Sequence, residues 1–377
     1  MLVLSQGAAL LIIGRILQGL SAACIMPATM ALVKTYFDGE NRQRAISFWS
    51  MGSWGGMGMT SFVGGAIATY MGWKWIFIFS ILLALFSMLL IKKVPESKPG
   101  SNGKFSFDFG GLFIFIFAMV GLNIYITQGT MLGWTSLLGL SLAAIAVIGI
   151  ISFILFEKTR KENPLIDFRL FKNRTFTGAT VANFFLNGSA GTLIVANTYV
   201  QVGRGFTAFQ SGMLSLGYLI AILSMIRVGE KLMQRVGAKN PMIWGTSSTF
   251  IGVSSMGLTF LPDFLYMIIV FLGFIFFGLG LGMFATPSTD TAVTSAPDPK
   301  VGEAAGIFKM ASSLGNAFGI AISSTIFTSV TATSNVTIGA AAGIFANSAF
   351  VLLSLLTVLF IVPNHTVGLT PMGQSLK

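Results

Sequence analysis

Long apolar stretches separated by short polar segments make up most of this chain. Each stretch runs for about 20 residues, the length of α-helix that crosses the hydrocarbon core of a bilayer. The apolar positions are continuous and do not alternate with polar ones, which excludes the strands of a membrane β-barrel. The pattern predicts eleven membrane-spanning helices, at residues 7–36, 45–70, 73–93, 109–128, 134–156, 175–200, 208–229, 240–261, 264–286, 303–330 and 341–362.

The composition supports an all-α membrane protein and excludes a water-soluble enzyme. Of the 377 residues, 54% are hydrophobic and only 9% are charged, and the mean hydropathy is +0.82. Soluble domains carry about 25% charged residues. With Cys24 and His365 as the single cysteine and histidine, the chain holds no disulfide framework or multi-cysteine metal site. No nucleophile, base and orienting acid occur together, so we expect no enzyme, no cofactor and no metal.

The basic residues are distributed unequally between alternate connections. Nineteen Lys and Arg lie in one set of connections and the tail, whereas the other set holds only Lys74 and Arg204. Cytoplasmic loops carry the excess of positive charge, so the pattern places the C-terminus in the cytoplasm. The basic residues form no extended patch, and we expect no nucleic-acid partner.

Two observations predict that further helices precede Met1. Eleven spans with a cytoplasmic C-terminus put the N-terminus outside, although nothing near Met1 guides its translocation. Carboxylates inside the membrane mark proton and ion pathways, but no predicted span holds one near its middle. The acids nearest to the predicted spans lie close to their ends or just beyond them, at Asp108, Glu157, Asp263, Asp290 and Glu303.

Polar and glycine-rich motifs interrupt the apolar spans. Arg15 lies deep in the first span, where a charge is costly unless it has a function. The second span carries a run of glycines that ends at Gly64-Gly65, which suits helices that pack closely and slide. Snorkelling of Arg15 to the headgroups and ordinary tight packing of the glycines are the alternative interpretations.

These motifs resemble a known family of transporters. The segments that carry the resemblance are Arg15-x-x-Gln18-Gly19, Pro27, the loop 38–45, Gly64-Gly65, residues 72–77, residues 163–174 and residues 302–319. They resemble the major facilitator superfamily, and more narrowly the fourteen-span drug:proton antiporters of the EmrB/QacA type. The resemblance covers nearly the whole chain and begins at the fourth helix of that family, so the first three helices are absent.

The resemblance implies a major facilitator fold with an incomplete N-terminal bundle. It assigns residues 1–93 to that bundle, 94–162 to two linking spans, 163–365 to the C-terminal six-helix bundle and 366–377 to a cytoplasmic tail. The implied function is export of drugs or toxic lipophilic compounds across the bacterial plasma membrane in exchange for protons, by alternating access and as a monomer.

Three motifs take their roles from the same resemblance. The proton-coupling motif is Arg15, Gln18 and Gly19, and the antiporter-type glycine motif is Gly64 and Gly65. Thr60 and Ser61 stand where that second motif normally has a Gly-Pro pair, which removes a proline kink. An echo of the family's cytoplasmic loop motif is carried by Leu232, Arg235 and Gly237, with Gln234 in place of the usual acid.

One predicted helix carries a polar face that points to a substrate cavity. Asn183 and Asn187 are spaced i, i+4 in the span 175–200, with Phe184 beside them, and Tyr218 lies in the next span. Aromatic rings with few hydrogen-bonding groups suit lipophilic, cationic small molecules. Bridging between helices is the other interpretation of these side chains.

Two other functions remain open at this point. A transporter of one specific metabolite would share the fold and show narrow substrate competition. A truncated, non-transporting membrane remnant would lack the two complete lobes that alternating access requires.

Overall fold

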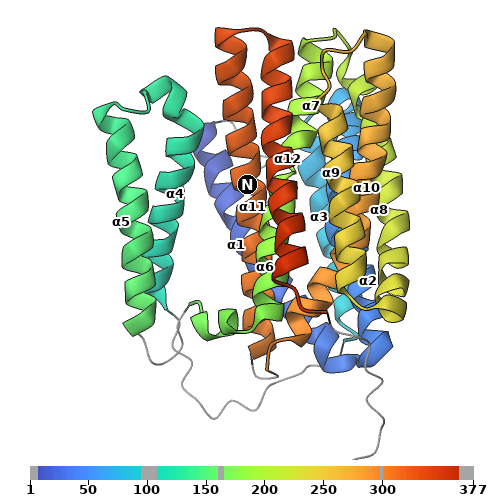
Figure 1. The fold of residues 1–377 in the computed structure, drawn as a ribbon. Helices are drawn as coiled ribbons and strands as arrows, with labels where there is room; N and C mark the ends of the chain where they lie inside the picture. The colour runs from blue at the N-terminus through green and yellow to red at the C-terminus, as the bar shows by residue number, and fades with distance from the viewer. Residues whose placement is uncertain (1–6, 95–107, 160–164, 298–299, 365–377) are drawn as a thin grey trace, which may run out of the picture.

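A computed structural model describes residues 7–94, 108–159, 165–297 and 300–364 of the chain. In this part the chain is helical apart from short connections (Figure 1). The helices are α1 (Ala8–Tyr36), α2 (Gly39–Tyr70), α3 (Lys74–Ile91), α4 (Phe109–Leu132), α5 (Leu137–Thr159), the short 3₁₀ helix η2 (Phe168–Lys172), α6 (Arg174–Gly188), α7 (Gly191–Val202), α8 (Ala208–Val236), α9 (Lys239–Met256), α10 (Asp263–Thr294), α11 (Val301–Thr333) and α12 (Val336–Phe360).

The structure confirms the predicted all-α membrane fold. Each of the eleven predicted spans corresponds to a helix or, at residues 175–200, to the pair α6 and α7. Among the described residues, nine spans are long and apolar enough to cross a bilayer, and α6 with α7 counts as one of them. The remaining two, α2 and α9, are the least apolar of the predicted spans by this criterion.

The prediction of one continuous helix at residues 175–200 is wrong. The helix stops at Gly188, turns through Ser189 and Ala190, and resumes at Gly191 as α7. The Ser189 side chain donates a hydrogen bond to the carbonyl of Leu186. Residues 188–191 are all small, so few side-chain contacts hold the helix straight here. Glycine also lowers the free-energy cost of a departure from regular helix.

Side chains cap several of the helix starts. Thr207 and Gln210 form a capping box at the start of α8. Asn173, Asn335 and Asp108 accept backbone hydrogen bonds at the starts of α6, α12 and α4. These caps satisfy amides that have no partner inside the helix and fix where each helix begins.

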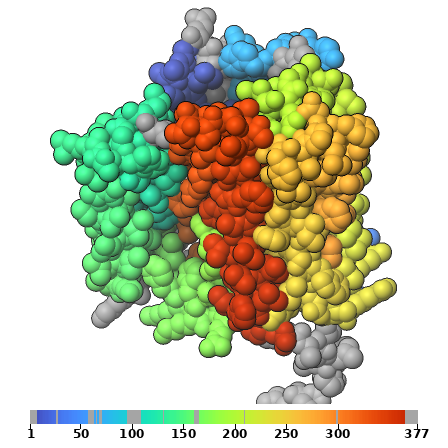
Figure 2. All heavy atoms as spheres, turned by 45° about the horizontal axis from the view of Figure 1, so that its top comes forward, coloured from blue at the N-terminus to red at the C-terminus, as the bar shows by residue number. Residues whose placement is uncertain are grey.

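The helices form three groups (Figure 1). The C-terminal helices α6–α12 pack into one bundle, and α4 and α5 form a hairpin that reaches this bundle mainly through α11. In the space-filling view, α12 faces the reader between the α4–α5 hairpin and helices α8–α10 (Figure 2). Helices α1–α3 lie behind, where α2 packs on α8 and α10, and α1 packs on α11.

The hydrophobic core lies within the C-terminal bundle. Its largest fully buried side chains include Tyr199, Tyr218, Tyr266 and Phe274. Backbones approach most closely between α6 and α11, where a Cβ on Gly319 would overlap the carbonyl group of Gly188. Glycines four residues apart allow such contact between membrane helices, because no side chain keeps the backbones separate.

Candidate functional site

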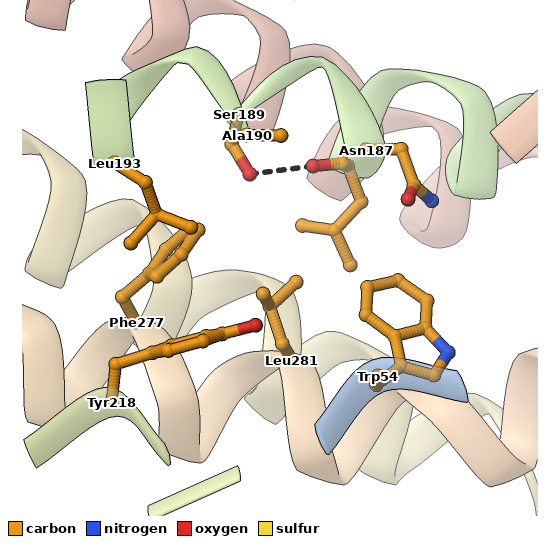
Figure 3. Close-up of a pocket in the computed structure, with 9 residues that line it drawn as sticks. Trp54, Asn187, Ser189, Ala190, Leu193, Tyr218, Phe277 and Leu281 are labelled. Carbon is orange, nitrogen blue, oxygen red and sulfur yellow. Dashed lines mark hydrogen bonds between the residues drawn. The ribbon is translucent and has the colours of Figure 1, made fainter. Parts of the chain in front are cut away.

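A small pocket lies between α2 and the C-terminal bundle (Figure 3). Trp54 of α2 lies beside the residues of α8 and α10, and the α6–α7 segment lies across the pocket from them. The complete lining is Trp54, Leu186, Asn187, Ser189, Ala190, Leu193, Tyr218, Phe277 and Leu281. The pocket therefore joins the two parts of the molecule that alternating access would move relative to each other.

The break between α6 and α7 places polar groups in this pocket. Asn187 ends α6 and Ser189 lies in the turn, and both line the pocket wall. Figure 3 shows the hydrogen bond from Ser189 to the Leu186 carbonyl above the apolar side chains of α8 and α10.

Two of the four residues predicted to form the substrate cavity line this pocket. They are Asn187 and Tyr218. Asn183 lies one turn earlier on α6, fully buried, and its amide donates a hydrogen bond of 3.0 Å to the carbonyl of Phe308. Phe184 packs its ring edge-on against Phe318 of α11. The side chains of Asn183 and Phe184 therefore hold α6 against α11 and do not line the pocket.

The pocket offers polar atoms that the described protein leaves without partners. The Asn187 amide nitrogen donates to the Asn183 carbonyl and side-chain oxygens at 2.8 and 2.9 Å, which leaves its own oxygen as an acceptor. Tyr218 is 2% exposed and its hydroxyl forms no hydrogen bond with the described residues. In Figure 3 its phenol extends across the pocket toward Leu281. An unpaired buried hydroxyl is costly and is available to a ligand.

Most of the remaining lining gave no signal in the sequence. Leu193, Phe277 and Leu281 are apolar residues in apolar helices, where hydropathy does not separate a pocket wall from a lipid-facing surface. Trp54 is the exception: as a large aromatic residue within the glycine-rich run of α2, it could have been noticed in the sequence. Only a contact map could assign the others to one cavity.

An ion pair and an apolar cluster join the two parts of the molecule at one end. Arg42 at the start of α2 contacts Asp290 of α10, with 3.4 Å between Nε and Oδ1. The Arg227 guanidinium of α8 lies 5.3 Å from the ring centre of Phe48 on α2. Beside them is a cluster from α1, α2, α10 and α11, made up of Met30, Ile46, Val293, Val301 and Ala305. This end of the inter-bundle contact is closed.

The position of Asp290 differs from the expectation. The sequence placed it just beyond the ninth predicted span, whereas α10 continues to Thr294 and buries Asp290 near its end. The polar run that includes Ser288 and Thr289 bonds back to helix carbonyls, including that of Ala285. These bonds allow a run of hydroxyl-bearing residues to remain helical.

The predicted proton-coupling motif lies on an exposed face of α1. Arg15 donates a hydrogen bond of 3.1 Å to Gln18 and lies 5.5 Å from the ring centre of Phe77 on α3. Gly19 follows one position later, and a Cβ there would meet open space. The motif thus connects α1 to α3 and does not touch the central pocket lining.

The other predicted motifs lie at helix ends or interfaces. Gly64 and Gly65 lie in α2, which continues as a helix to Tyr70, and its backbone is also helical at Thr60 and Ser61. The cytoplasmic loop motif forms the end of α8, with Leu232 and Arg235 in its last turns. Gly237 ends that helix with φ of 81°, a conformation that favours glycine.

At the opposite end of the C-terminal bundle, Arg204 joins two loops. This guanidinium pairs with Asp263, donates to the carbonyls of Thr259 and Leu261 at 2.7 and 2.8 Å, and donates to the Tyr199 hydroxyl at 3.0 Å. Desolvation by burial alone would lower the pKa of Arg204, but these hydrogen bonds and charges raise it above the ordinary value. Arg204 therefore fastens two loops as a permanent cation.

The described residues hold no cluster of three His, Cys, Asp or Glu side chains that could bind a metal ion. Cys24 is exposed on α1. His365 lies outside the described residues. The pocket between α2 and the C-terminal bundle is the candidate site because aromatic side chains and two hydrogen-bonding residues, Asn187 and Tyr218, converge on it.

Comparison with known proteins finds one matching family and several proteins of similar sequence. The model of the Major Facilitator Superfamily matches residues 1–166 and 156–320. The chain is 53% identical over 365 residues to the quinolone resistance protein NorB of Staphylococcus aureus strain MRSA252. The proteins of the same name from strains bovine RF122 / ET3-1 and COL show the same identity. In each case the match covers 97% of this chain and 79% of the relative.

Proposed function

The chain belongs to the major facilitator superfamily, and on this premise we propose that it exports drugs across the bacterial plasma membrane in exchange for protons. The observation that carries the proposal is its 53% identity, over 97% of its length, to a protein named for quinolone resistance. The pocket between α2 and the C-terminal bundle is the proposed drug site, with Asn187 and Tyr218 as its polar contacts.

The chemistry of the pocket supports broad recognition of lipophilic compounds. The rings of Trp54, Tyr218 and Phe277 offer dispersion contacts and aromatic faces on which a cationic group can rest. The acceptor of Asn187 and the hydroxyl of Tyr218 add two hydrogen-bonding groups. Few directional contacts on apolar walls suit a family of related shapes better than a single metabolite.

The size of the pocket supports alternating access. Its cavity volume is about 10 Å³, which is close to the space of one water molecule. A drug-sized ligand needs a pocket of about 300 Å³ or more. Separation of α2 from α8 and α10 would create this space, and the Arg42–Asp290 pair at one end would hold the helices together until then.

We infer the orientation from the distribution of basic residues and the proton coupling from the family resemblance. The excess of Lys and Arg on one side supports a cytoplasmic C-terminus. Arg15, Gln18 and Gly19 support coupling to protons, because they match the proton-coupling motif of the drug:proton antiporters that the chain resembles. We propose the monomer as the transporting unit, since the pocket is formed within one chain.

The test is quinolone transport into inside-out membrane vesicles that contain the full chain. Acidifying the vesicle interior should drive uptake of a fluorescent quinolone, and unrelated lipophilic cations such as ethidium should compete. Dissipating the proton gradient should stop uptake. Absence of competition by ethidium would contradict broad drug export, and uptake that ignores the gradient would contradict exchange with protons.

A variant of the proposed coupling motif separates transport from insertion. Arg15→Ala should abolish gradient-driven uptake and leave the amount of protein in the membrane unchanged, because Arg15 is exposed and, among the described residues, contacts Gln18 and Phe77. Lys74→Ala is a matched control, since it removes another exposed cation from the same group of helices. Unchanged uptake by the Arg15 variant would remove this residue from the coupling mechanism.

A further inference from the structure

Asn347 of α12 lies against the turn that separates α6 from α7. Its side chain is fully buried and satisfies both of its polar atoms in one orientation of the amide. In that orientation its nitrogen donates a hydrogen bond of 3.0 Å to the carbonyl of Gly188, the last residue of α6. Its oxygen accepts hydrogen bonds from the backbone amide and the hydroxyl of Thr192 in α7, at 2.9 and 3.2 Å. One side chain thus bonds to the helices on both sides of the turn.

These bonds supply a partner that the backbone of the turn does not. Ser189, Ala190 and Thr192 each donate their backbone amide to the carbonyl three positions earlier. In a continuous α-helix the amide of Thr192 would donate to the carbonyl of Gly188, but in this turn it donates to Ser189 and to Asn347. A buried carbonyl without a donor costs free energy. Asn347 therefore stabilises the turn at a carbonyl that the change of bonding pattern leaves open.

Helix α11 also approaches this turn closely. A Cβ on Gly191 would overlap the hydroxyl of Ser323 and would lie 3.1 Å from the amide group of Asn347. A Cβ on Gly319 would overlap the carbonyl of Gly188. Because α11 and α12 both contact the turn directly, it has little room to shift while Asn347 holds it.

The same turn supplies much of the wall of the proposed drug pocket (Figure 3). Five of the nine lining residues come from residues 186–193. Gly188 and Thr192, to which Asn347 bonds, lie among them in the chain. Asn347 does not itself line the pocket. Any effect of Asn347 on a bound molecule must therefore pass through the turn.

We propose that Asn347 is a positioning residue of the drug site. Its hydrogen bonds to Gly188 and Thr192 fix the turn in the shape that presents the acceptor of Asn187 and the segment around Ser189 to the ligand. The inference rests on the proposed function, because it assumes that drugs bind in this pocket. A wall that is already in place binds a ligand at a smaller entropic cost than one that must first be ordered. Loss of Asn347 should therefore weaken drug binding more than it slows turnover.

Transport kinetics of the full chain in inside-out vesicles test the proposal. Asn347→Leu keeps a side chain of similar size and removes the three hydrogen bonds to the turn. The KM for a fluorescent quinolone should rise about tenfold, because the buried carbonyl of Gly188 loses its donor and the turn is no longer fixed. The maximal rate should stay within about twofold of the wild type, since the change acts on binding.

A second residue of α12 provides a matched control. Ser354 lies two turns after Asn347, is fully buried, and donates a hydrogen bond of 2.7 Å to the carbonyl of Ala182 on α6. Ser354→Ala therefore also removes a buried hydrogen bond between α12 and α6, but at a distance from the turn. The melting temperature should fall in both variants, whereas the KM should rise only in Asn347→Leu.

Hydrogen–deuterium exchange reports on the turn without a drug or a proton gradient. In Asn347→Leu, peptides that cover residues 186–193 should exchange faster than in the wild type, because local opening becomes easier when a buried hydrogen bond is lost. Peptides from α10 should exchange at the wild-type rate. Thr192→Val keeps the shape of the side chain and removes only the hydroxyl that donates to Asn347. It should raise exchange of the turn by a smaller factor, and it decides the question if Asn347→Leu does not insert.

The outcomes distinguish this inference from the function on which it rests. Saturable uptake by the wild type with an unchanged KM in Asn347→Leu would overturn the role of Asn347 and leave the proposed function standing. An equal rise in KM in Ser354→Ala would assign the effect to a general loosening of α12 and would also overturn it. Exchange of the turn at the wild-type rate in the variants would contradict the hydrogen bonds themselves. If the wild type takes up no quinolone, the proposed function fails, and the exchange rates alone decide whether Asn347 fixes the turn.

Discussion

Helices α1–α3 and helices α6–α12 differ sharply in how far their residues are buried against protein. In the most apolar window of the span Arg174–Val202, 67% of the residues are buried. The corresponding shares are 6% for α1 and 0% for α3. Both groups are apolar, so the difference lies in what covers them. Lipid or further protein must cover α1 and α3, because their own chain does so only in part.

The difference in burial implies that helices α1–α3 and helices α6–α12 have different physical roles. Side chains of α6–α12 pack against one another, so most substitutions there change contacts within the protein. An apolar residue that faces lipid gains nothing by exchanging lipid for a similar apolar neighbour. Stability should therefore reside in the C-terminal bundle, and the contacts of α2 with α8 and α10 should govern which conformation is adopted.

Replacing one glycine in each group of helices should give the largest difference in stability between the two groups. Gly319→Ala forces a methyl group onto the backbone of α6 at Gly188. Because the backbone of α6 cannot move away from the added methyl group, we expect the free energy of unfolding to fall by about 3 kcal/mol or more. Gly19→Ala of α1 meets open space and should be neutral or slightly stabilising in a helix. Thermal unfolding of both purified variants measures the contrast, and equal melting temperatures would remove it.

Replacing one arginine in each group of helices should give the next largest difference in stability. Arg204→Ala leaves the carbonyls of Thr259 and Leu261 without their donor. The Asp263 side chain is 73% exposed and can be solvated instead, so we expect a loss of about 2 kcal/mol, mainly from the two carbonyls. Arg15→Ala removes one exposed hydrogen bond and should cost less than about 1 kcal/mol. Melting temperatures in the same detergent compare the two, and a larger loss for Arg15→Ala would contradict the proposed division of tasks.

The stabilisation by Arg204 should not fall as the pH rises. The pKa of Arg204 is raised in the folded protein by its hydrogen bonds and neighbouring charges, against the effect of desolvation. A raised pKa means that the contribution is complete below the unfolded value and is lost only above the folded one. Both values lie above the range in which the protein is assayed. The melting-temperature difference between the wild type and Arg204→Ala should therefore stay constant from about pH 7 to about pH 10.

Breaking the contact between the two groups should change conformation more than stability. Arg42→Ala removes the partner of Asp290, worth about 2 kcal/mol for a partly buried charged hydrogen bond. Thiol labelling of Ser47→Cys, a fully buried position in α2, measures opening once Cys24 is replaced by Ser. Labelling should accelerate several-fold. Exchanging the charges, with Arg42→Asp and Asp290→Arg together, should restore slow labelling, and failure to do so would assign the effect to packing.

The smallest expected effect lies in the pocket at the border of the two groups. Tyr218→Phe keeps the ring and removes the unpaired hydroxyl, so a drug that uses it should lose about 1 kcal/mol, near a fivefold rise in KM. Tyr70→Phe removes an exposed hydroxyl of α2 and serves as the control. Quinolone uptake by vesicles measures both, and an equal KM in the two variants would exclude the hydroxyl from binding.

The helices could be predicted because their apolar length is a direct requirement of the bilayer. Irregularities within them could not. The turn at Ser189 uses small residues that membrane helices also tolerate in straight segments. Pro287 and the polar residues after it resembled a helix end, yet α10 continues because its hydroxyl groups bond to its own carbonyls and Asp290 finds Arg42. Both outcomes depend on neighbours distant in sequence.

The pocket could be predicted only through its polar members. Asn187 and Tyr218 stood out as hydrogen-bonding groups in apolar spans, and both line the cavity. Asn183 carried the same signal but points its amide to Phe308 on α11. One helical turn decides whether such a residue serves a ligand or a neighbouring helix, and spacing alone does not distinguish the two.

The uncharged lining of the pocket also sets how long a bound molecule stays. All nine lining residues are neutral, so a charged drug gives up its hydration without gaining a counter-ion. If drugs bind here as proposed, we expect a charged drug to stay only briefly, because the dissociation rate carries most of the difference between weak and tight binding. A pump built in this way clears drugs by rapid turnover at high concentration, and protects least when the drug is scarce.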